Sequence, residues 1–483
     1  MRGGMVAFGT SGLRGLATDL LAGPGYAHVA AFASYLLSSG RVARGGKILV
    51  GCDRRESSPD LTRQSLAALV GAGLQPVYCG ILPTPALAFS NITLGVPAVM
   101  VTGSHIPPDR NGLKFYRPDG EIDKADECAI AALALEASAA GMPVLASLPG
   151  LPSPDGEALR SYVARYKAAF AEPILQGRRI GVYRHSSVAS DTLAELAAWL
   201  GADVMPLGES GEFVAVDTEA IDASTAGRLQ NWSRQLRLDA IISTDGDGDR
   251  PLMTDETGAV IRGDALGLLS SLFLKADAVV TPVSSNPGIT GRYGFTVIRT
   301  KVGSPYVLEE MDKAVAQGFK RVLGFEANGG LLVGTPVEVN GSALAALPTR
   351  DSILPILCAF SAAHAARLPL SELVSDLALP VCLSGRIENF ARGNSDRLMA
   401  KLRISTENIR VFLSDVGIVS RVEDIDGIQI HLEDGGMIHL RPSGNAPEMR
   451  CYASAPTGER AAALLQAGLS RIEQFPDNNG AGD

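Results

Sequence analysis

Three aspartates on alternate residues form the segment of this sequence with the clearest chemical meaning. Asp245, Asp247 and Asp249 are separated by single glycines, and Arg250 follows directly. Carboxylates at this spacing can turn toward one hard cation, and three ligands leave positions on Mg²⁺ open for a phosphate. An EF-hand is excluded because Arg250 occupies the position that needs glycine and the flanking runs have the character of strands. A solvated acidic turn is the remaining alternative.

A serine in a turn-rich segment is the second candidate for chemistry. Ser104 follows a predicted buried strand and precedes His105, so its hydroxyl has the position of a nucleophile or a phosphate carrier. Taken alone, such a Ser-His pair is more often part of a capped turn. A nucleophile elbow is excluded because Ile106 replaces the glycine that the elbow needs. The Asn-Gly pair at 111–112 predicts a hairpin turn that returns the chain through Lys114.

Two arginines enclose a short polar loop near the C-terminus. The segment from Arg441 to Arg450 also contains Ser443, Gly444 and Asn445. Hydroxyl, amide and backbone donors between two guanidinium groups suit a dianionic phosphate, which arginine binds through forked hydrogen bonds. An ordinary polar turn would not need both arginines, so the segment predicts a phosphate-binding loop.

Two further glycine-rich loops give weaker signals. Glu326 and Asn328 stand on alternate residues after a predicted strand at 321–323, where they can bind neighbouring sugar hydroxyls as acceptor and donor. A plain left-handed turn explains that pattern equally well. Arg14 brings a cation to the loop 8–15, whose glycine spacing does not match a dinucleotide-binding fingerprint.

The elements that must position these loops are short apolar runs that alternate with amphipathic segments. The predicted strands are 47–51, 98–102, 179–183 and 240–244, and the predicted helices are 61–72, 191–200 and 306–317. This alternation implies crossover connections and parallel or mixed sheets, and therefore an α/β fold. Shorter strands at 427–431 and 437–440 and a helix over 457–475 predict a smaller C-terminal unit.

Composition marks the predicted boundaries between domains. A Pro- and Gly-rich stretch at 141–157 predicts a linker, and the character of the chain changes again near 364–385. The long middle block contains two rounds of strand–helix alternation and is divided near residue 256. The predicted domains are 1–148, 157–255, 256–366 and 375–476. The first contains the segment around Ser104 (the serine loop) and the second contains the three aspartates. The third contains the segment around Glu326 and Asn328 (the sugar loop), and the fourth contains the segment 441–450 (the phosphate loop). The polar tail 477–483 is expected to be frayed.

Charge and cysteine content narrow the class of protein. The 43 basic and 52 acidic residues give a net charge of −9, which argues against binding to nucleic acid or to acidic membranes. The six cysteines form no Cys-x-x-Cys pair, which predicts small buried thiols in a reducing compartment. The sequence has no signal peptide and no apolar stretch of membrane-spanning length, so a cytoplasmic location is expected.

In this order along the chain, the motifs resemble those of the α-D-phosphohexomutase superfamily, the phosphoglucomutase and phosphomannomutase enzymes. The resemblance runs from Phe8 to Arg450. It implies three α/β mixed-sheet domains and a smaller α+β C-terminal domain around a central cleft. It also implies a phosphoserine at Ser104, a hexose 1,6-bisphosphate activator, and Mg²⁺ held by the serine phosphate and the three aspartates.

The resemblance assigns roles to the residues that match its motifs. The catalytic set is Ser104, His105, Lys114, Arg14 and Arg250. The metal ligands are Ser104, Asp245, Asp247 and Asp249. The substrate-binding set is Glu326, Asn328, Arg441, Ser443, Gly444, Asn445 and Arg450, with Lys301 added because it follows a predicted strand on the sugar side. Whether His105 or Lys114 acts as acid or base stays open.

Four departures from the usual motifs of that superfamily stand out. They are Gly103 for Ala and Ile106 for Asn in the serine loop, Asn328 for Ser in the sugar loop, and Asn445-Ala446 for Thr-Glu in the phosphate loop. None of them removes a residue that the chemistry requires.

The expected function is a phosphomannomutase/phosphoglucomutase that exchanges the 1- and 6-phosphates of a hexose. The sugar loop does not match the pattern of phosphoglucosamine mutases, which makes that alternative weaker. A phosphosugar hydrolase that uses the same serine is disfavoured by the separate phosphate loop around Arg441. An inactive sugar-phosphate-binding protein is disfavoured by the intact serine and aspartates. The expected partner is a small sugar phosphate, with no nucleic acid or membrane, and the chain is expected to be a monomer or homodimer.

Overall fold

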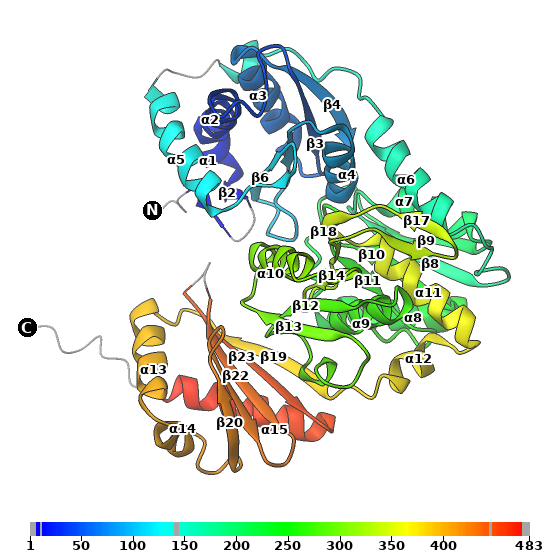
Figure 1. Cartoon of the computed structure of the whole chain (residues 1–483), viewed down its shortest axis with the longest axis vertical. Coiled ribbons are helices and arrows are strands. Elements are labelled where there is room, and N and C mark those ends of the chain that lie inside the picture. The colour runs from blue at the N-terminus through cyan, green and yellow to red at the C-terminus, as the bar shows by residue number, and fades with distance from the viewer. Residues whose placement is uncertain (1–5, 10–11, 140–143, 444–446, 476–483) are drawn as a thin grey trace, which may run out of the picture.

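The first sheet has seven strands in the order β1-β2-β6-β5-β3-β4, with β7 beside β6. The computed structural model describes residues 6–9, 12–139, 144–443 and 447–475 (Figure 1). Strand β3 pairs in parallel with β4 and β5, and the other pairs are antiparallel. The strands are β1 (Ala7–Phe8), β2 (Leu13–Leu16), β3 (Lys47–Cys52), β4 (Gln75–Ile81), β5 (Ala98–Val101), β6 (Arg110–Arg117) and β7 (Gly120–Glu121). The helices of this part are α1 (Ala17–Leu21), α2 (Pro24–Ser38), α3 (Ser58–Gly71), α4 (Thr84–Leu94) and α5 (Lys124–Ala139).

Helices cover both faces of this sheet, which explains why the buried residues of β3 and all of β5 are apolar. Ile48 and Val50 of β3 pack in one cluster with residues of α2, α3 and α5. Leu49, between them, packs with residues of α4 in another. Because successive strand residues point to opposite faces, a strand with both faces buried has no polar side.

The second and third sheets are mixed. The second has the order β11-β10-β8-β9, with only β11 antiparallel. The third has the order β13-β12-β14-β15-β18, with the first three parallel and the last two antiparallel, and β16 and β17 form a separate ribbon. The second part comprises α6 (Glu157–Ala169), β8 (Arg179–His185), α7 (Ser190–Trp199), β9 (Asp203–Glu209), α8 (Ala223–Leu236), β10 (Ala240–Thr244) and β11 (Pro251–Met253). The third comprises α9 (Gly263–Phe273), β12 (Ala278–Pro282), β13 (Thr296–Thr300), α10 (Ser304–Ala316), β14 (Val322–Phe325), β15 (Leu331–Val333), β16 (Val337–Val339), β17 (Ser342–Leu344), β18 (Leu347–Asp351), α11 (Ile353–Ala366) and α12 (Leu370–Asp376).

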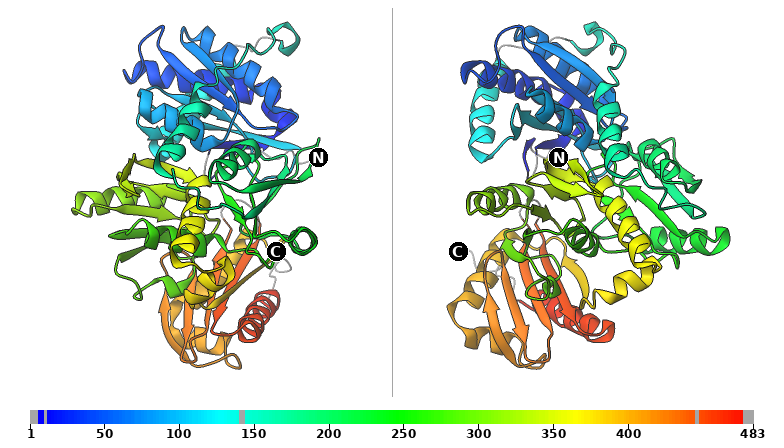
Figure 2. Two further views of the ribbon diagram at one scale, coloured as in Figure 1. Left: turned by 90° about the vertical axis from the view of Figure 1, so that its right-hand side faces the viewer. Right: turned by 45° about the vertical axis from the view of Figure 1, so that its right-hand side comes forward.

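The fourth sheet is antiparallel, in the order β19-β23-β22-β21-β20, and α15 packs against it. It lies at the opposite end of the molecule from the first sheet, with the second and third sheets between them (Figures 1 and 2). Its elements are β19 (Val381–Ile387), α13 (Arg392–Ile404), α14 (Thr406–Phe412), β20 (Val419–Glu423), β21 (Ile428–Leu432), β22 (Met437–Pro442), β23 (Met449–Ala455) and α15 (Gly458–Glu473).

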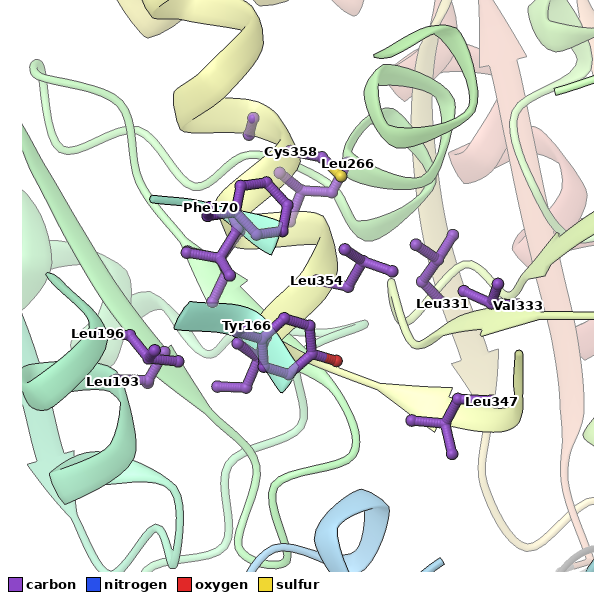
Figure 3. Packing of buried hydrophobic residues seen from close by; sticks show 14 of the residues in the cluster. Tyr166, Phe170, Leu193, Leu196, Leu266, Leu331, Val333, Leu347, Leu354 and Cys358 are labelled. Carbon is purple, nitrogen blue, oxygen red and sulfur yellow. The ribbon is translucent and has the colours of Figure 1, made fainter. Parts of the chain in front are cut away.

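Hydrophobic packing joins the first three sheets but leaves the fourth with a core of its own. One continuous cluster includes Met100 of β5, Leu193 of α7 and Leu354 of α11. In Figure 3, Tyr166 of α6 lies between Leu193 of α7 and Leu354 of α11. The C-terminal sheet and its helices bury a separate cluster that includes Ile430. The first three parts therefore share one hydrophobic core, whereas the fourth part has a separate core.

The mixed sheets and their covering helices confirm the predicted α/β fold, with a smaller α+β unit at the C-terminus. One large sheet falls within each of the four predicted ranges, and the domain boundaries themselves stay a prediction. Part of the predicted linker is held in place, since Arg63 donates hydrogen bonds to the carbonyl oxygens of Leu145, Leu148 and Pro149. The C-terminal tail lies outside the described residues.

The cysteines only partly follow the expectation of buried thiols. All six are free, but Cys128 is exposed and Cys382 is half-buried. Cys128 lies on α5, whose outer face meets solvent, so the expectation was wrong there. Within the described part of the chain, no single helix is long and apolar enough to cross a membrane, and only the bent pair α11 and α12 reaches that length and composition together.

Candidate active site

The aspartate loop joins β10 to β11 and gathers its three carboxylates at one point. Asp245, Asp247 and Asp249 are buried, and one oxygen of each lies within 4.8 Å of the others. Gly248 allows the sharp turn, because its φ is +76° and a Cβ there would lie 3.0 Å from a side-chain carbon of Pro83. The strands on both sides and the convergence of the carboxylates agree with the loop expected from the sequence.

The donor set of this cluster fits a divalent cation that prefers oxygen ligands. Lys114 Nζ lies 2.7 Å from Asp247 Oδ2 and 2.8 Å from Asp249 Oδ2. The Oδ1 atoms of both aspartates are buried without a hydrogen-bond partner among the described residues. Burial, Asp247 and Asp249 together raise the pKa of Asp245 well above its usual range. A hard cation such as Mg²⁺ would use these open oxygens and keep all three carboxylates ionised.

Ser104 reaches this cluster from the first sheet. Its Oγ donates a hydrogen bond to Asp245 Oδ2 at 2.8 Å and lies 3.3 Å from His105 Nδ1. The residue has a φ of +56°, a left-handed conformation that is uncommon for serine, and Thr102 Oγ1 accepts a hydrogen bond from its backbone N–H. Strained backbone of this kind persists where the surrounding structure holds it, and it aims the serine hydroxyl at the carboxylates.

The predicted hairpin turn at Asn111 and Gly112 was wrong. Both residues lie inside β6, where Gly112 pairs with Arg14 of β2. Asn111 donates hydrogen bonds to the hydroxyl groups of Ser57 and Ser58. These long-range contacts override the local turn preference of Asn-Gly, and the chain reverses direction earlier, between β5 and β6. Strand β6 still brings Lys114 into the site.

Two arginines and a histidine lie beside the serine. Arg14 donates a hydrogen bond to the carbonyl oxygen of Gly103, and burial and Arg250 lower its pKa to about 10. Arg250, burial and Arg14 lower the pKa of His105 far below its ordinary value, so the imidazole is neutral here. A dianionic substrate between these arginines would raise the pKa of His105 again, because it would offset their charge.

Arg55 holds the backbone of the serine loop and is not among the site residues predicted from the sequence. Its guanidinium donates to four carbonyl oxygens, those of Ser104 at 2.8 Å, Ile106 at 2.6 Å, Pro107 at 2.7 Å and Arg110 at 2.9 Å. The side chain is fully buried, so water cannot easily replace it as the hydrogen-bond donor to these carbonyl oxygens. Arg55 thereby fixes the loop whose unusual backbone presents the Ser104 hydroxyl.

The departure at Gly103 follows from the position of Arg55. A Cβ at residue 103 would lie 2.8 Å from the guanidinium carbon of Arg55. The guanidinium carbon also lies 3.9 Å from the ring centroid of Phe213, which comes from the second part of the chain. The arginine is therefore enclosed between two parts of the molecule, and glycine leaves room for it.

Replacing Arg55 with lysine should lower both stability and turnover. An ammonium group cannot donate to four carbonyls at once, and each buried carbonyl left unpaired costs about 1–3 kcal/mol. We expect the free energy of unfolding in urea to fall by several kcal/mol, about 2–4, and kcat to fall with it. Arg54→Lys is the matched control, because Arg54 forms an exposed ion pair with Asp191 and no other among the described residues. Equal stability of the two variants would contradict the role of Arg55.

The sugar loop presents one acid that is held by a cation. Glu326 Oε1 accepts hydrogen bonds from Ser304 Oγ at 2.8 Å and from Arg350 at 3.2 Å. Asn328 Oδ1 accepts a hydrogen bond from the backbone N–H of Gly330, so this side chain also shapes its own loop. Lys301 is exposed, 5.8 Å from the ring centroid of Tyr306.

The two arginines at the ends of the phosphate loop lie side by side on neighbouring strands of the fourth sheet. Arg441 of β22 and Arg450 of β23 are direct partners in register. Asp426 and Glu448 each accept a hydrogen bond from one of them, at 2.9 Å. Asp426 also accepts a hydrogen bond from the backbone N–H of Val302, beside Lys301, and so ties this strand end to the third sheet.

Only part of the predicted phosphate loop can be placed. Ser443 is described and lies with Arg441 at the wall of a cavity of about 860 Å³, whereas Gly444 and Asn445 lie outside the described residues. Glu219, between β9 and α8, interacts electrostatically with both Arg250 and Arg450. Glu219 also lines a small pocket with His439 of β22 and Tyr452 of β23, so the second part of the chain meets the fourth sheet there.

Three charged residues of the site were missed from the sequence: Arg55, Glu219 and Arg350. Arg55 carried a usable signal, because Asp53-x-Arg55 directly follows a parallel strand and functional loops gather at that edge of a sheet. Arg350 stands at the end of a strand before an apolar helix, a weaker signal. Nothing in its local sequence marks Glu219.

Comparison with known proteins finds relatives over almost the full length of the chain. Residues 5–140 match the family model for phosphoglucomutase/phosphomannomutase α/β/α domain I, and residues 260–380 match the model for domain III. A phosphomannomutase of Sinorhizobium fredii is 49% identical over 463 residues, which cover 96% of this chain and 98% of that protein. A phosphomannomutase of Salmonella muenchen is 42% identical over 475 residues, which cover 97% of this chain and 96% of that protein.

Solved structures share the same fold. The crystal structure of a phosphoglucomutase/phosphomannomutase family protein from Burkholderia thailandensis superposes with a TM-score of 0.72 at 19% identity. The match covers 98% of each chain, so all four sheets take part in the likeness. Relatives of high identity over almost the full length, together with this fold, establish that the chain belongs to the phosphoglucomutase/phosphomannomutase family of the α-D-phosphohexomutase superfamily.

Proposed function

We propose that this protein is a phosphohexomutase that moves phosphate between the 1- and 6-positions of mannose phosphate, glucose phosphate or both. The observation that carries the proposal is the Ser104 hydroxyl, which donates a 2.8 Å hydrogen bond into a buried cluster of three aspartates. The identity of 49% to a phosphomannomutase supports the reaction class. The arginines at the start of the phosphate loop supply a second anion site for the phosphate that does not react.

In the proposed reaction Ser104 carries a phosphate that moves to the free hydroxyl of the sugar monophosphate. The bond from phosphorus to Ser104 Oγ breaks and a bond to the sugar oxygen forms, while the sugar hydroxyl gives its proton to a base. His105 Nδ1 lies 3.3 Å from Ser104 Oγ, and Lys114 pairs with Asp247 in the adjacent aspartate cluster, and the choice between these two residues stays open. The resulting hexose 1,6-bisphosphate turns over in the site, and its other phosphate returns to Ser104.

The charged residues around Ser104 would stabilise this transfer by position and charge. When bound, Mg²⁺ would neutralise charge on the transferring phosphoryl group. Asp245, Asp247 and Asp249 would hold it together with the serine phosphate, and Arg14 and Arg250 would hold the phosphate oxygens. Glu326 and Asn328, with Lys301, would bind the sugar hydroxyls. Arg441, Ser443, Gly444, Asn445 and Arg450 would bind the distal phosphate.

A coupled assay tests the proposed function directly. The enzyme is given mannose 1-phosphate or glucose 1-phosphate with Mg²⁺, with and without a catalytic amount of the hexose 1,6-bisphosphate. We expect the 6-phosphate isomer to form without free phosphate, faster with the bisphosphate, because it phosphorylates Ser104. Release of inorganic phosphate without isomer would favour the hydrolase instead. Faster conversion of glucosamine 1-phosphate than of either hexose phosphate would favour a phosphoglucosamine mutase.

The proposal involves a small sugar phosphate as the partner of the site. A cytoplasmic location, a monomeric or homodimeric state and the absence of nucleic acid and membrane partners stay predictions. The ratio of the rates with mannose 1-phosphate and glucose 1-phosphate gives the preference between these two sugars, which differ at a single hydroxyl group.

A further inference from the structure

The end of β18 is where separate parts of the chain meet. Four consecutive side chains there, Thr349 to Ser352, bond to residues that lie far away along the chain; we call this stretch the β18 anchor. Thr349 donates to Glu121 of β7, Asp351 accepts from Tyr162 and Tyr166 of α6, and Ser352 donates to the carbonyl oxygen of Gly248 in the aspartate loop. Arg350 points from this fixed base into the site.

Arg350 bridges the aspartate loop and the sugar loop with one guanidinium group. Its Nε and Nη2 donate to Asp249 Oδ2 at 3.1 and 2.8 Å, and its Nη1 donates to Glu326 Oε1 at 3.2 Å and to Ser304 Oγ. The side chain is 5% exposed, so water screens these ion pairs little. A Cβ at residue 330 would lie 2.8 Å from three carbons of Arg350, so Gly330 makes room for its stem.

We infer that Arg350 is a positioning residue that couples the binding of the divalent cation to the binding of the sugar. This inference rests on the proposed function of Asp249 as a metal ligand and Glu326 as a sugar ligand. The planar fork of arginine fixes both carboxylates in one geometry. A shift of Glu326 on sugar binding is therefore transmitted to Asp249, and by reciprocity cation binding alters the affinity for sugar.

The coupling is measured by calorimetry on the full chain without turnover. The unphosphorylated enzyme is titrated with Mg²⁺ in the absence and presence of saturating glucose 1-phosphate. We expect the sugar to tighten Mg²⁺ binding in the wild type by about fivefold or more. We call the Mg²⁺ dissociation constant without sugar divided by the one with sugar the coupling ratio. In Arg350→Met this ratio should lie within about twofold of one, because the bridge between the two carboxylates is gone.

Two further variants separate coupling from structural damage. Arg350→Lys keeps the charge but lacks the fork, so it should restore part of the Mg²⁺ affinity without restoring the coupling. Glu326→Gln removes the other end of the bridge and leaves Arg350 in place, so it should also abolish the coupling if Arg350→Met does not fold. Arg63→Met is the matched control, because Arg63 binds the carbonyls of the linker and should keep the wild-type ratio.

A wild-type ratio retained in Arg350→Met and in Glu326→Gln would overturn the inference. Failure of the proposed function is distinguished from failure of the coupling by the coupled assay, in which the wild type would then form no isomer. A wild type that turns over, with coupling lost in both variants and kept in Arg63→Met, supports the inference.

Discussion

Replacing Ser104 with alanine is expected to abolish isomer formation, lowering kcat about 10⁴-fold or more. The reason is chemical, because the alanine side chain has no oxygen to carry the phosphate between the two positions of the sugar. The fold should remain, since the Ser104 side chain is small and the loop is held through its backbone by Arg55. The coupled assay measures the loss, and intact-mass spectrometry before and after incubation with the bisphosphate measures the phosphate on the protein.

A second serine provides the control for this substitution. Ser270 is buried in α9, where its hydroxyl donates to the carbonyl oxygen of Leu266 in the same helix. Ser270→Ala removes one buried hydroxyl without touching the site, so its turnover and its phosphate content should match the wild type. If Ser104→Ala retained turnover within tenfold of the wild type, or still gained one phosphate, the carrier would have to be another residue.

Asp247→Asn should give the second largest loss, because it removes a charge from the candidate metal site while keeping its shape. An asparagine oxygen can still accept the 2.7 Å hydrogen bond from Thr84, and Lys114 keeps its ion pair with Asp249. We expect kcat to fall about a hundredfold or more, since metal stabilisation of the transferring phosphate is worth several kcal/mol. Higher Mg²⁺ should recover part of the activity, and titration of the rate with Mg²⁺ measures this shift.

Asp255 offers a matched aspartate outside the site. Its Oδ1 accepts hydrogen bonds from the backbone N–H and the hydroxyl group of Thr257 and from the backbone N–H of Ala259. The side-chain oxygen of an asparagine can accept the same hydrogen bonds. Asp255→Asn should therefore leave the Mg²⁺ dependence unchanged. An Asp247→Asn enzyme with the same Mg²⁺ requirement as Asp255→Asn would show that the aspartate cluster is not the metal site.

The sequence was most informative where local pattern and chemistry coincide. Glycine on alternate residues leaves the three aspartates free to converge, and the short apolar runs beside them indicate strands, so the loop between β10 and β11 was predictable. The Asn-Gly pair at 111–112 shows the limit of such local reasoning. Its turn preference is outweighed by pairing with β2 and by the bonds of Asn111 to α3 and to the residue before it, Ser57.

What the sequence could not provide are contacts between residues far apart along the chain. Arg350 and Asp249 are separated by 101 positions, and Arg55 and Ser104 by 49. An isolated arginine among ordinary neighbours has no periodicity that distinguishes a buried role from a surface one. Only the packing of separate sheets reveals which arginines are buried and which carboxylates or carbonyls they meet.

The separate hydrophobic cluster of the C-terminal sheet has a consequence for how the protein loses activity. A part with its own core can open as a cooperative unit at a lower free energy than the rest of the molecule. The Ser104 loop and the aspartate loop belong to the parts joined by the larger cluster, whereas Arg441 and Arg450 belong to the other. On mild heating the C-terminal part, which carries Arg441 and Arg450, would then unfold first. Loss of activity would therefore precede unfolding of the whole protein and would be reversed on cooling.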